Sequence, residues 1–246
     1  MTMRTRPVNL GLMQRQSAIQ SAALRGRLVA FTLTDLLVGL AALAVVVAAV
    51  MPPVVAARRK AQLARCTANL GQIDQAVLAF SHDNGGTLPA PVAGQKGDLW
   101  WWYKEQVKPY AGLKGPSSTN DAVFACPNDR GYSDPRPFHD SARFDYNSYV
   151  FNGVFLPGTP NIAGWPLTAV KQPQRTLLVM EWTAHAPLSW HHSRTGRNNL
   201  PFYCDAQSVV GFVDGHVSFT KIYYDGYNAA FTQDPIAGYD YQYSGN

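Results

Sequence analysis

The feature that most constrains this chain is an uncharged apolar run near its N-terminus. Residues 36–57 contain no charged side chain and are dominated by Leu, Val, Ala and Met. At about 1.5 Å per residue, a helix of this length measures about 33 Å and crosses the hydrocarbon core of a bilayer. The apolar region of a secretory signal peptide is shorter, about 7–15 residues, and ends at a cleavage site. We therefore predict one transmembrane helix, kinked at Pro52 and Pro53.

Basic residues are concentrated beside this run. Residues 1–30 contain five arginines and no acidic residue, whereas the remaining 216 residues contain 16 basic and 16 acidic side chains. The net charge of +5 therefore belongs to the N-terminal segment and not to a folded binding face. The basic cluster at 58–65 directly follows the apolar run, as juxtamembrane basic residues do. This distribution argues against nucleic-acid binding, which requires Lys and Arg on the folded domain.

An amphipathic pattern follows the apolar run. Apolar residues recur at intervals of three and four positions, namely Leu63, Cys66, Leu70, Ile73, Val77 and Phe80. This spacing places them on one face of a helix, so we expect that face to pack on a folded domain. The helix should end before the turn sequence Asp-Asn-Gly-Gly at 83–86. The pattern predicts one helix of roughly 50 residues, half in lipid and half on a domain.

Residues 30–38, Ala-Phe-Thr-Leu-Thr-Asp-Leu-Leu-Val, resemble the processing site of type IV prepilins and type II secretion pseudopilins. In that family a basic leader ends at Gly, prepilin peptidase cleaves before a Phe that is then N-methylated, and a Glu lies four residues later. The resemblance makes Ala30 the last leader residue, Phe31 the mature N-terminus and Asp35 the acidic residue that meets the amine of a neighbouring subunit. Ala30 and Asp35 replace the usual Gly and Glu. The alternative for Asp35 is an acid at the membrane surface, since a carboxylate in lipid needs a partner.

The rest of the chain resembles the prepilin-like branch with a processing-associated C-terminal region and a His-x9-Asp-Gly signature. The resemblance covers residues 26–222 and rests on the order of several segments: 65–72, 83–89, 101–112, 124–129, 148–152, 173–179 and 213–217. The signature His is off pattern, because 21 residues separate His192 from Asp214. Cys204 stands where the pattern places the His, which indicates an insertion over 198–205. The role of His191 and His192 stays open.

The resemblance implies an α+β, pilin-like fold. A long N-terminal helix packs by its second half on an antiparallel sheet, and the C-terminal region is rich in loops. The implied organisation is a leader at 1–30, a transmembrane half-helix at 31–57 and an extracytoplasmic domain at 58–246. The implied function is a structural subunit, not an enzyme, with a single span in the inner membrane and other pilin or pseudopilin subunits as partners. Cys66 and Cys126 occupy family positions, so a disulfide is implied, with two buried thiols as the alternative.

Asp214 and Gly215 lie between two strand-like segments, 209–213 and 216–222. Asp-Gly is the preferred sequence of a two-residue hairpin loop. Such a loop fixes the strand register and gives two cross-strand pairs on one face, Phe212 with Val217 and Val210 with Phe219. We therefore predict that Asp214 is a turn residue and not a metal ligand or a catalytic acid.

Several His and Asp residues raise the question of a metal site: His185, His191, His192, His216, Asp205 and Asp214. Their spacing matches no zinc motif, and the chain contains no nucleophile elbow, P-loop or G-x-G-x-x-G. No catalytic residue or resident cofactor is therefore assigned. Because some pseudopilins order their C-terminal part with calcium, we also consider a Ca²⁺ site in the Gly/Tyr-rich tail, which contains Asp225, Asp234 and Asp240. Residues 100–103, Trp-Trp-Trp-Tyr, are expected to pack in the core.

Two other functions fit the same sequence. One is a membrane-anchored extracytoplasmic binding module that is never processed and never polymerises. The other is a metal-dependent hydrolase that uses His191, His192 or His216 with Asp214. An intact N-terminus in the membrane fraction distinguishes the first, and stoichiometric zinc lost on His→Ala substitution distinguishes the second. The sequence does not separate a pilus from a secretion pseudopilus.

Overall fold

The computed structural model describes residues 32–94, 99–132, 136–154, 158–185, 189–191, 206–223, 234 and 236–246. The chain divides into two units, Met1–Val54 and Val55–Asn246. The division falls inside the apolar run at 36–57. Helix α2, Leu33–Asp83, contains residues of both units and continues through Pro52 and Pro53.

The part of α2 in the first unit is apolar and exposed. Its large side chains, among them Leu37, Leu43 and Val47, are all more than one-third exposed. The described residues contain one helix that is long and apolar enough to cross a membrane, and its most apolar 18-residue window is 0% buried. By length and composition, this half of the helix can act as a membrane span.

The second half of α2 is amphipathic, as the apolar spacing predicts. Cys66, Leu70, Ile73 and Val77 are fully buried, and the two ends of the predicted face pack against the same core. The helix ends at Asp83, one residue into the predicted turn. The N–H of Gly86 donates to the carbonyl oxygen of Ser81 (2.8 Å), and Gly85 has a φ of 67°. This left-handed glycine ends the helix by the usual C-terminal capping geometry.

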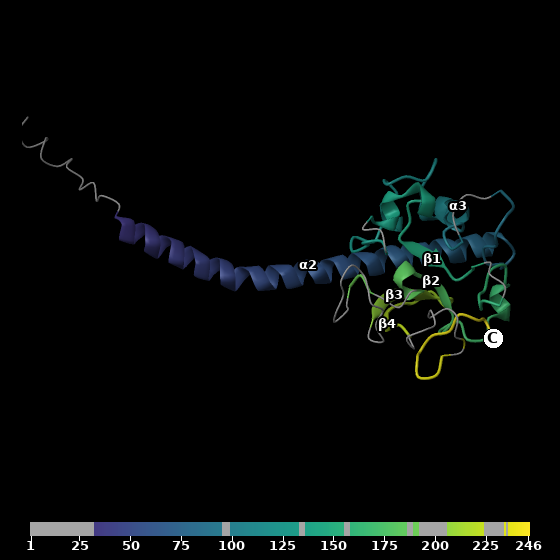
Figure 1. Ribbon diagram of the computed structural model, residues 1–246. Helices are drawn as coiled ribbons and strands as arrows, with labels where there is room; N and C mark the ends of the chain where they lie inside the picture. Colours follow the sequence, from purple (N-terminus) through teal and green to yellow (C-terminus); the bar gives the residue numbers. More distant parts are fainter. Residues whose placement is uncertain are drawn as a thin grey trace, which may run out of the picture. The chain divides into compact units, whose positions relative to one another are not determined.

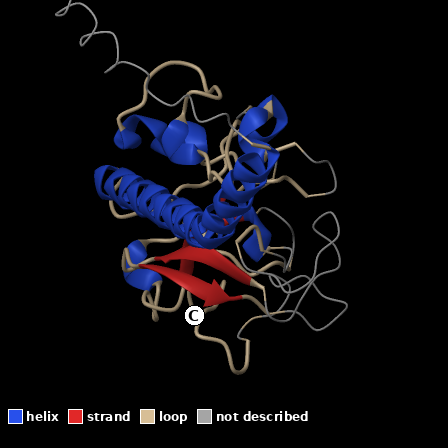
Figure 2. Cartoon of the chain, turned by 90° about the vertical axis from the view of Figure 1, so that its left-hand side faces the viewer, coloured by secondary structure: helices blue, strands red, loops and turns tan. Residues whose placement is uncertain are grey.

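The sheet of the second unit has four antiparallel strands in the order β1-β2-β3-β4, namely Tyr149–Phe151, Leu177–Glu181, Gln207–Phe212 and Val217–Lys221. The second half of α2 lies across one face of this sheet (Figures 1 and 2). The Tyr149 hydroxyl donates to the carbonyl oxygen of Cys66 (3.3 Å), and a Cβ added to Gly71 would contact Val217. One long helix and an antiparallel sheet give the described residues an α+β architecture.

The β3–β4 hairpin differs from its predicted register by one residue. The N–H of Phe212 donates to the His216 carbonyl oxygen (3.0 Å), so the loop is residues 213–215 and not the Asp-Gly pair alone. The cross-strand pairs are Val209–Phe219, Val210–Ser218 and Gly211–Val217. The predicted pairing of Phe212 with Val217 and of Val210 with Phe219 is therefore wrong. The reason is Gly215, whose φ of 89° fits the three-residue loop that ends in a left-handed glycine.

Short helices and loops cover the rest of the domain. Among the described residues, helix α3, Lys104–Val107, is followed along the chain by six 3-10 turns: Lys108–Ala111, Ala122–Phe124, Phe138–Asp140, Ala142–Phe144, Leu167–Ala169 and Trp182–Ala184. Trp101, Trp102 and Tyr103 are buried in the core, as expected, and Trp100 is partly buried against it. The C-terminal segment joins the β2 side of the core, where the N–H of Leu177 donates to the carbonyl oxygen of Gln242 (3.0 Å).

Candidate functional site

Asp35 lies in the first turn of α2 and bonds to Thr32. The Thr32 N–H and hydroxyl both donate to Asp35 Oδ2, at 3.0 and 2.7 Å, and the Asp35 N–H donates back to Thr32 Oγ1 (3.1 Å). This reciprocal pattern is a capping box, which satisfies the free N–H groups at a helix start. Asp35 therefore has a local structural role in addition to any role in assembly. Ala30 and Phe31, the predicted processing residues, lie outside the described residues.

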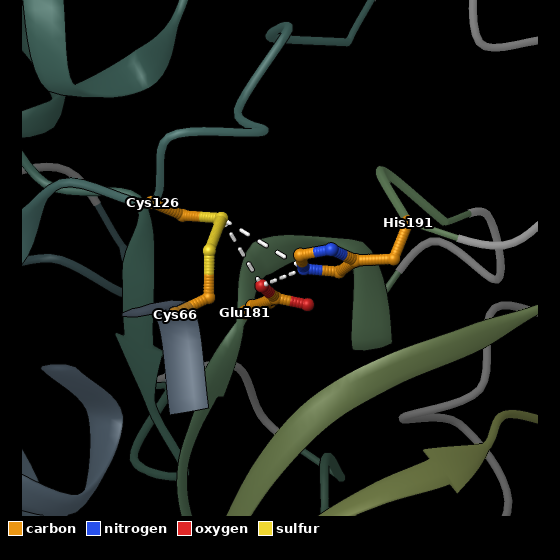
Figure 3. A group of neighbouring side chains, drawn as sticks. All are labelled: Cys66, Cys126, Glu181 and His191. Carbon is orange, nitrogen blue, oxygen red and sulfur yellow. Dashed lines mark hydrogen bonds and ion pairs between the residues drawn. A yellow bond between two sulfur atoms is a disulfide. The ribbon is translucent and has the colours of Figure 1, made fainter. Parts of the chain in front are cut away.

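A group of four side chains meets inside the domain, and we call it the Cys–Glu–His cluster (Figure 3). Its members are Cys66 in α2, Cys126 in the loop after the second 3-10 turn, Glu181 at the end of β2, and His191. Cys66 and Cys126 are joined by a disulfide, the pair that the family resemblance implies. The two cysteines and Glu181 are fully buried, and the His191 side chain is 4% exposed. The cluster thus brings together residues 125 positions apart in the chain.

Glu181 and His191 contact each other and the disulfide. His191 Nε2 lies 2.7 Å from Glu181 Oε1, and this oxygen lies 3.3 Å from Cys126 Sγ. Cys126 Sγ is 3.8 Å from the same imidazole nitrogen. One carboxylate oxygen, one ring nitrogen and the sulfurs therefore face a common point. Tyr149 pairs with Glu181 across β1 and β2. Burial is the main cause that raises the pKa of the Tyr149 hydroxyl, and the charge of the neighbouring Glu181 raises it further.

A second layer of hydrogen bonds fixes these side chains. The N–H of Val209 on β3 donates to Glu181 Oε2 (2.8 Å), so the other carboxylate oxygen faces the sulfurs. The Asn128 side-chain amide bonds to His191 Nδ1 (2.7 Å), which leaves Nε2 facing Glu181. The N–H of His191 also donates to Ser189 Oγ (2.9 Å). These hydrogen bonds fix the orientations of the Glu181 carboxylate and the His191 imidazole relative to each other.

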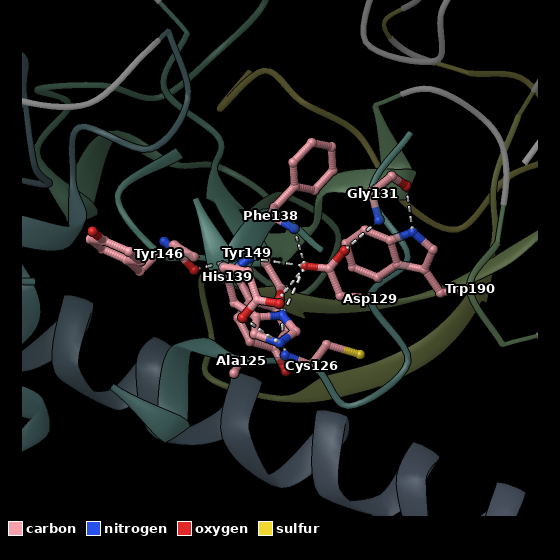
Figure 4. Close-up of polar contacts among 12 residues, drawn as sticks. Ala125, Cys126, Asp129, Gly131, Phe138, His139, Tyr146, Tyr149 and Trp190 are labelled. Atoms are coloured by element: carbon pink, nitrogen blue, oxygen red, sulfur yellow. Dashed lines mark hydrogen bonds and ion pairs between the residues drawn. The ribbon is translucent and has the colours of Figure 1, made fainter. Parts of the chain in front are cut away.

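A buried carboxylate, Asp129, holds the loop that carries Cys126 (Figure 4). Asp129 accepts bonds from the N–H groups of Gly131 and Phe138 and from the Ser148 hydroxyl, at 2.8, 2.9 and 2.7 Å. Ser148 Oγ in turn accepts the N–H of Cys126 (3.0 Å). The loop position of Cys126 is therefore set by a carboxylate whose lone pairs are used by backbone and hydroxyl donors.

His139 completes the Asp129 network. Its Nδ1 lies 3.1 Å from Asp129 Oδ2. Burial opposes a charge on the His139 ring, but the hydrogen bond and the charge of Asp129 outweigh burial and raise the pKa of His139. The charged imidazole is thus favoured beside the buried carboxylate.

Those of the other predicted His and Asp residues that the structure describes do not gather into one site. His216 and Asp214 pair at the exposed hairpin loop (Nδ1 to Oδ1 2.6 Å), which fits the predicted turn role of Asp214. His185 is buried beside Trp100, and burial lowers the pKa of its ring to about 3. His192, Cys204, Asp205 and Asp225 lie outside the described residues.

The tail carboxylates of the calcium prediction have separate environments. Asp234 accepts the N–H groups of Tyr243 and Ser244, at 2.8 and 3.0 Å. Asp240 is exposed. Asp234 therefore orders the C-terminal segment through backbone hydrogen bonds, and the calcium site stays a prediction.

Glu181 and Asp129 were not predicted as site residues. Glu181 ends the strand Leu-Leu-Val-Met-Glu, where the sequence offers only one signal, an acid directly after four apolar residues. Asp129 follows the Cys-Pro-Asn segment and resembles an ordinary turn acid in sequence. Comparison with protein-family models, with curated proteins and with solved structures finds no match to the chain.

Proposed function

We propose that this chain is a prepilin-like structural subunit, cleaved before Phe31, held in the inner membrane by residues 31–57 and assembled into a pilus or a secretion pseudopilus. The observation that carries the proposal is the exposed apolar half of α2 in a chain that also has a well-packed domain. Burying apolar area contributes about 25 cal/mol per Å², so a whole exposed apolar helix surface is strongly unfavourable in water. Such a surface needs lipid or other apolar helices around it.

The residue types of this half suit both environments. A helix satisfies its own backbone groups, which is the requirement for spanning a bilayer. Gly39 has no neighbouring heavy atom within 4 Å of an added Cβ, and Ala is frequent from 41 to 57. Small residues let apolar helices approach closely and pack by van der Waals contact. These features support helix packing between subunits after extraction from the membrane.

Asp35 is proposed to act at the helix start. Cleavage before Phe31 would create an α-amino group four residues from the Asp35 carboxylate. In the apolar environment of packed helices, a carboxylate and an amine from neighbouring subunits stabilise each other because each removes an unpaired charge. The capping box with Thr32 holds the carboxylate at this end of the helix.

The first test is intact-mass and N-terminal peptide mass spectrometry on membrane-extracted protein, expressed with its own prepilin peptidase. A chain that begins at methylated Phe31 supports the proposal. A chain that retains residues 1–30 favours the membrane-anchored binding module instead. Cleavage near Ala56 or Ala57 indicates a secreted domain and contradicts the transmembrane interpretation.

Two variants separate processing from assembly. Ala30→Gly restores the usual family residue and should raise the cleaved fraction. Asp35→Asn keeps the size of the side chain and removes its charge, so cleavage should continue while cross-linked multimers are lost. If Asp35→Asn assembles as well as the wild type, the carboxylate has only its capping role.

A further inference from the structure

We propose that the Cys–Glu–His cluster is a redox-gated zinc site. When the Cys66–Cys126 disulfide is reduced, the two thiolates, the Glu181 carboxylate and His191 Nε2 bind one Zn²⁺ ion. Reoxidation to the disulfide releases the ion. This site lies within the folded domain and is independent of whether Phe31 is the mature N-terminus.

The distances between ligand atoms fit a metal ion. One ligand atom from each of the four residues lies within 4.8 Å of all the others. Tetrahedral zinc has bonds of about 2.0–2.3 Å, which place its ligand atoms roughly 3.3–3.8 Å apart. Cys126 Sγ is already 3.3 Å from Glu181 Oε1 and 3.8 Å from His191 Nε2. Nε2 and Oε1, at 2.7 Å, need to separate by less than about 1 Å to reach that range. The two sulfurs are bonded to each other in the disulfide, so reduction must let them separate to about 3.8 Å before they can bind one ion.

The donor set is of the kind that zinc takes. Two thiolates, one imidazole and one carboxylate combine the soft and borderline ligands that zinc prefers, and exclude the all-oxygen sites of calcium and magnesium. Four protein ligands leave no open position, which is typical of a structural zinc site. A metal here would keep the link between α2 and the Cys126 loop that the disulfide makes, and would also tie both to the end of β2.

The second layer also fits metal binding. Zinc-bound His and carboxylate ligands normally have their outer atoms hydrogen-bonded. Glu181 Oε2 already accepts the Val209 N–H, and His191 Nδ1 already faces the Asn128 amide. For zinc on Nε2, the ring proton moves to Nδ1 and the Asn128 amide presents its oxygen, a rotation that keeps the same contact.

In the disulfide form, the sulfurs offer the buried Glu181 and His191 side chains no strong polar partner. A disulfide has no proton to donate to Glu181 and no charge to balance it. Burying a carboxylate and an imidazole costs free energy that an apolar pair of the same volume would not. A Zn²⁺ ion would bond directly to the Glu181 carboxylate and to the His191 imidazole, and so give both buried polar side chains a partner at the centre of the cluster.

The reaction balances with a named reductant. A phosphine attacks one sulfur and the S–S bond breaks. Water then gives its oxygen to the phosphorus, which forms the phosphine oxide, and its two protons to the two sulfurs, which become thiols. The two thiols then release two protons as Zn²⁺ binds their sulfurs. In reverse, oxidised glutathione accepts two electrons and two protons, becomes two glutathione thiols, and leaves the protein disulfide and free Zn²⁺.

The experiment uses the full chain in detergent with Cys204→Ser, which removes the third thiol. The oxidised and the phosphine-reduced protein are titrated with Co²⁺ without oxygen, and zinc is then added to displace the cobalt. Tetrahedral cobalt bound to thiolates gives intense visible bands and sulfur-to-metal charge-transfer absorption. We expect about one Co²⁺ per reduced chain with both signals, displacement by zinc, and neither signal in the oxidised chain.

Three variants locate the site. Glu181→Gln and His191→Gln should each weaken Co²⁺ binding by at least about tenfold, the lower limit seen even for outer-layer substitutions. His216→Gln is the matched control, because His216 also pairs with a carboxylate but lies at the exposed hairpin, and it should bind as the background protein does. Near-ultraviolet circular dichroism of each oxidised variant checks that the domain is folded.

A second measurement uses the wild-type sequence and therefore does not depend on whether a variant folds. Iodoacetamide alkylation of Cys66 and Cys126 in the reduced wild-type sequence should slow by at least about tenfold when zinc is present, because bound thiolates are no longer free nucleophiles. The proposal is overturned if reduced protein shows no cobalt–thiolate absorption, if zinc leaves alkylation unchanged, or if only His216→Gln abolishes binding.

Discussion

Helix α2 carries large apolar side chains along both of its halves, but only the second half buries them. In Leu33–Val54, Leu43 is 59% exposed, whereas in Val55–Asp83 Leu70 is fully buried. The amino acid is the same and so is the backbone conformation. The difference lies in the neighbouring positions, which are apolar all round the first half and polar between the buried residues of the second.

This contrast shows that the pattern of apolar residues, and not their number, determines the partner of a helix. A one-sided stripe needs one face of a domain, and the sheet provides it. A helix that is apolar all round needs a partner on every side, which means lipid or a bundle of other helices. The same substitution should therefore destabilise the domain when it is made in the second half and leave domain stability nearly unchanged when it is made in the first.

The largest expected effect is on the buried half. Leu70→Ala should lower the free energy of unfolding of the domain by about 2–5 kcal/mol, because it removes buried methyl groups and leaves a cavity. The measurement is chemical denaturation of the full chain in detergent, followed by tryptophan fluorescence.

Leu43→Ala is the matched control in the exposed half. It makes the same chemical change where the side chain touches no domain core, so the domain should unfold within about 0.5 kcal/mol of the wild type. Equal losses for both variants would break the comparison between the two halves.

A somewhat smaller effect is expected at Gly211, where the second half of α2 lies close against β3. A Cβ added to Gly211 on β3 would clash with the carboxylate of Asp74. Gly211→Ala should therefore cost about 1–3 kcal/mol, as overpacking of a core does. Gly39→Ala is the control, since a Cβ there meets nothing within 4 Å and Ala is the better helix former. A neutral Gly211→Ala would show that α2 can move away from β3.

Asp74 also makes stability depend on pH. Among the described residues neither of its carboxyl oxygens has a hydrogen-bond partner. Burial first, and the charge of Asp214 second, raise the pKa of Asp74 well above its usual range. The folded state thus binds a proton that the unfolded state releases above about pH 4, so stability falls as the pH rises from there toward the folded pKa.

Asp74→Asn tests this dependence, because the amide cannot ionise. The difference in unfolding free energy between wild type and variant should shift in favour of the variant as the pH rises above the ordinary carboxyl range. Melting temperatures of both proteins across that range give the slope. Parallel curves would mean that Asp74 is ionised in the folded domain or that its burial is relieved.

The same physics explains what could be predicted from the sequence. The stripe of Cys66, Leu70, Ile73 and Val77 is a local pattern, and the helix follows it. Hairpin register depends on loop length, and Asp-Gly fits either a two-residue loop or the end of a three-residue one, so the prediction was off by one position. The meeting of Glu181 and His191 with the Cys66–Cys126 disulfide depends on long-range contacts that no local spacing encodes.

The smallest expected effect concerns the hairpin that lies over the second half of α2. Gly215 has a φ of 89°, and an added Cβ would approach the flexible end of Gln75 at 3.2 Å. Because that side chain can move, the cost of Gly215→Ala should come from the backbone, about 1–2 kcal/mol for a left-handed residue. Gly215→Asn should cost less, since Asn tolerates this conformation better than Ala. Denaturation midpoints of the two variants check the order. If Asn is as unfavourable as Ala, the contact with Gln75 and not the backbone sets the cost. The Gln75 side chain would then be held too firmly by the packing of the hairpin on α2 to move aside.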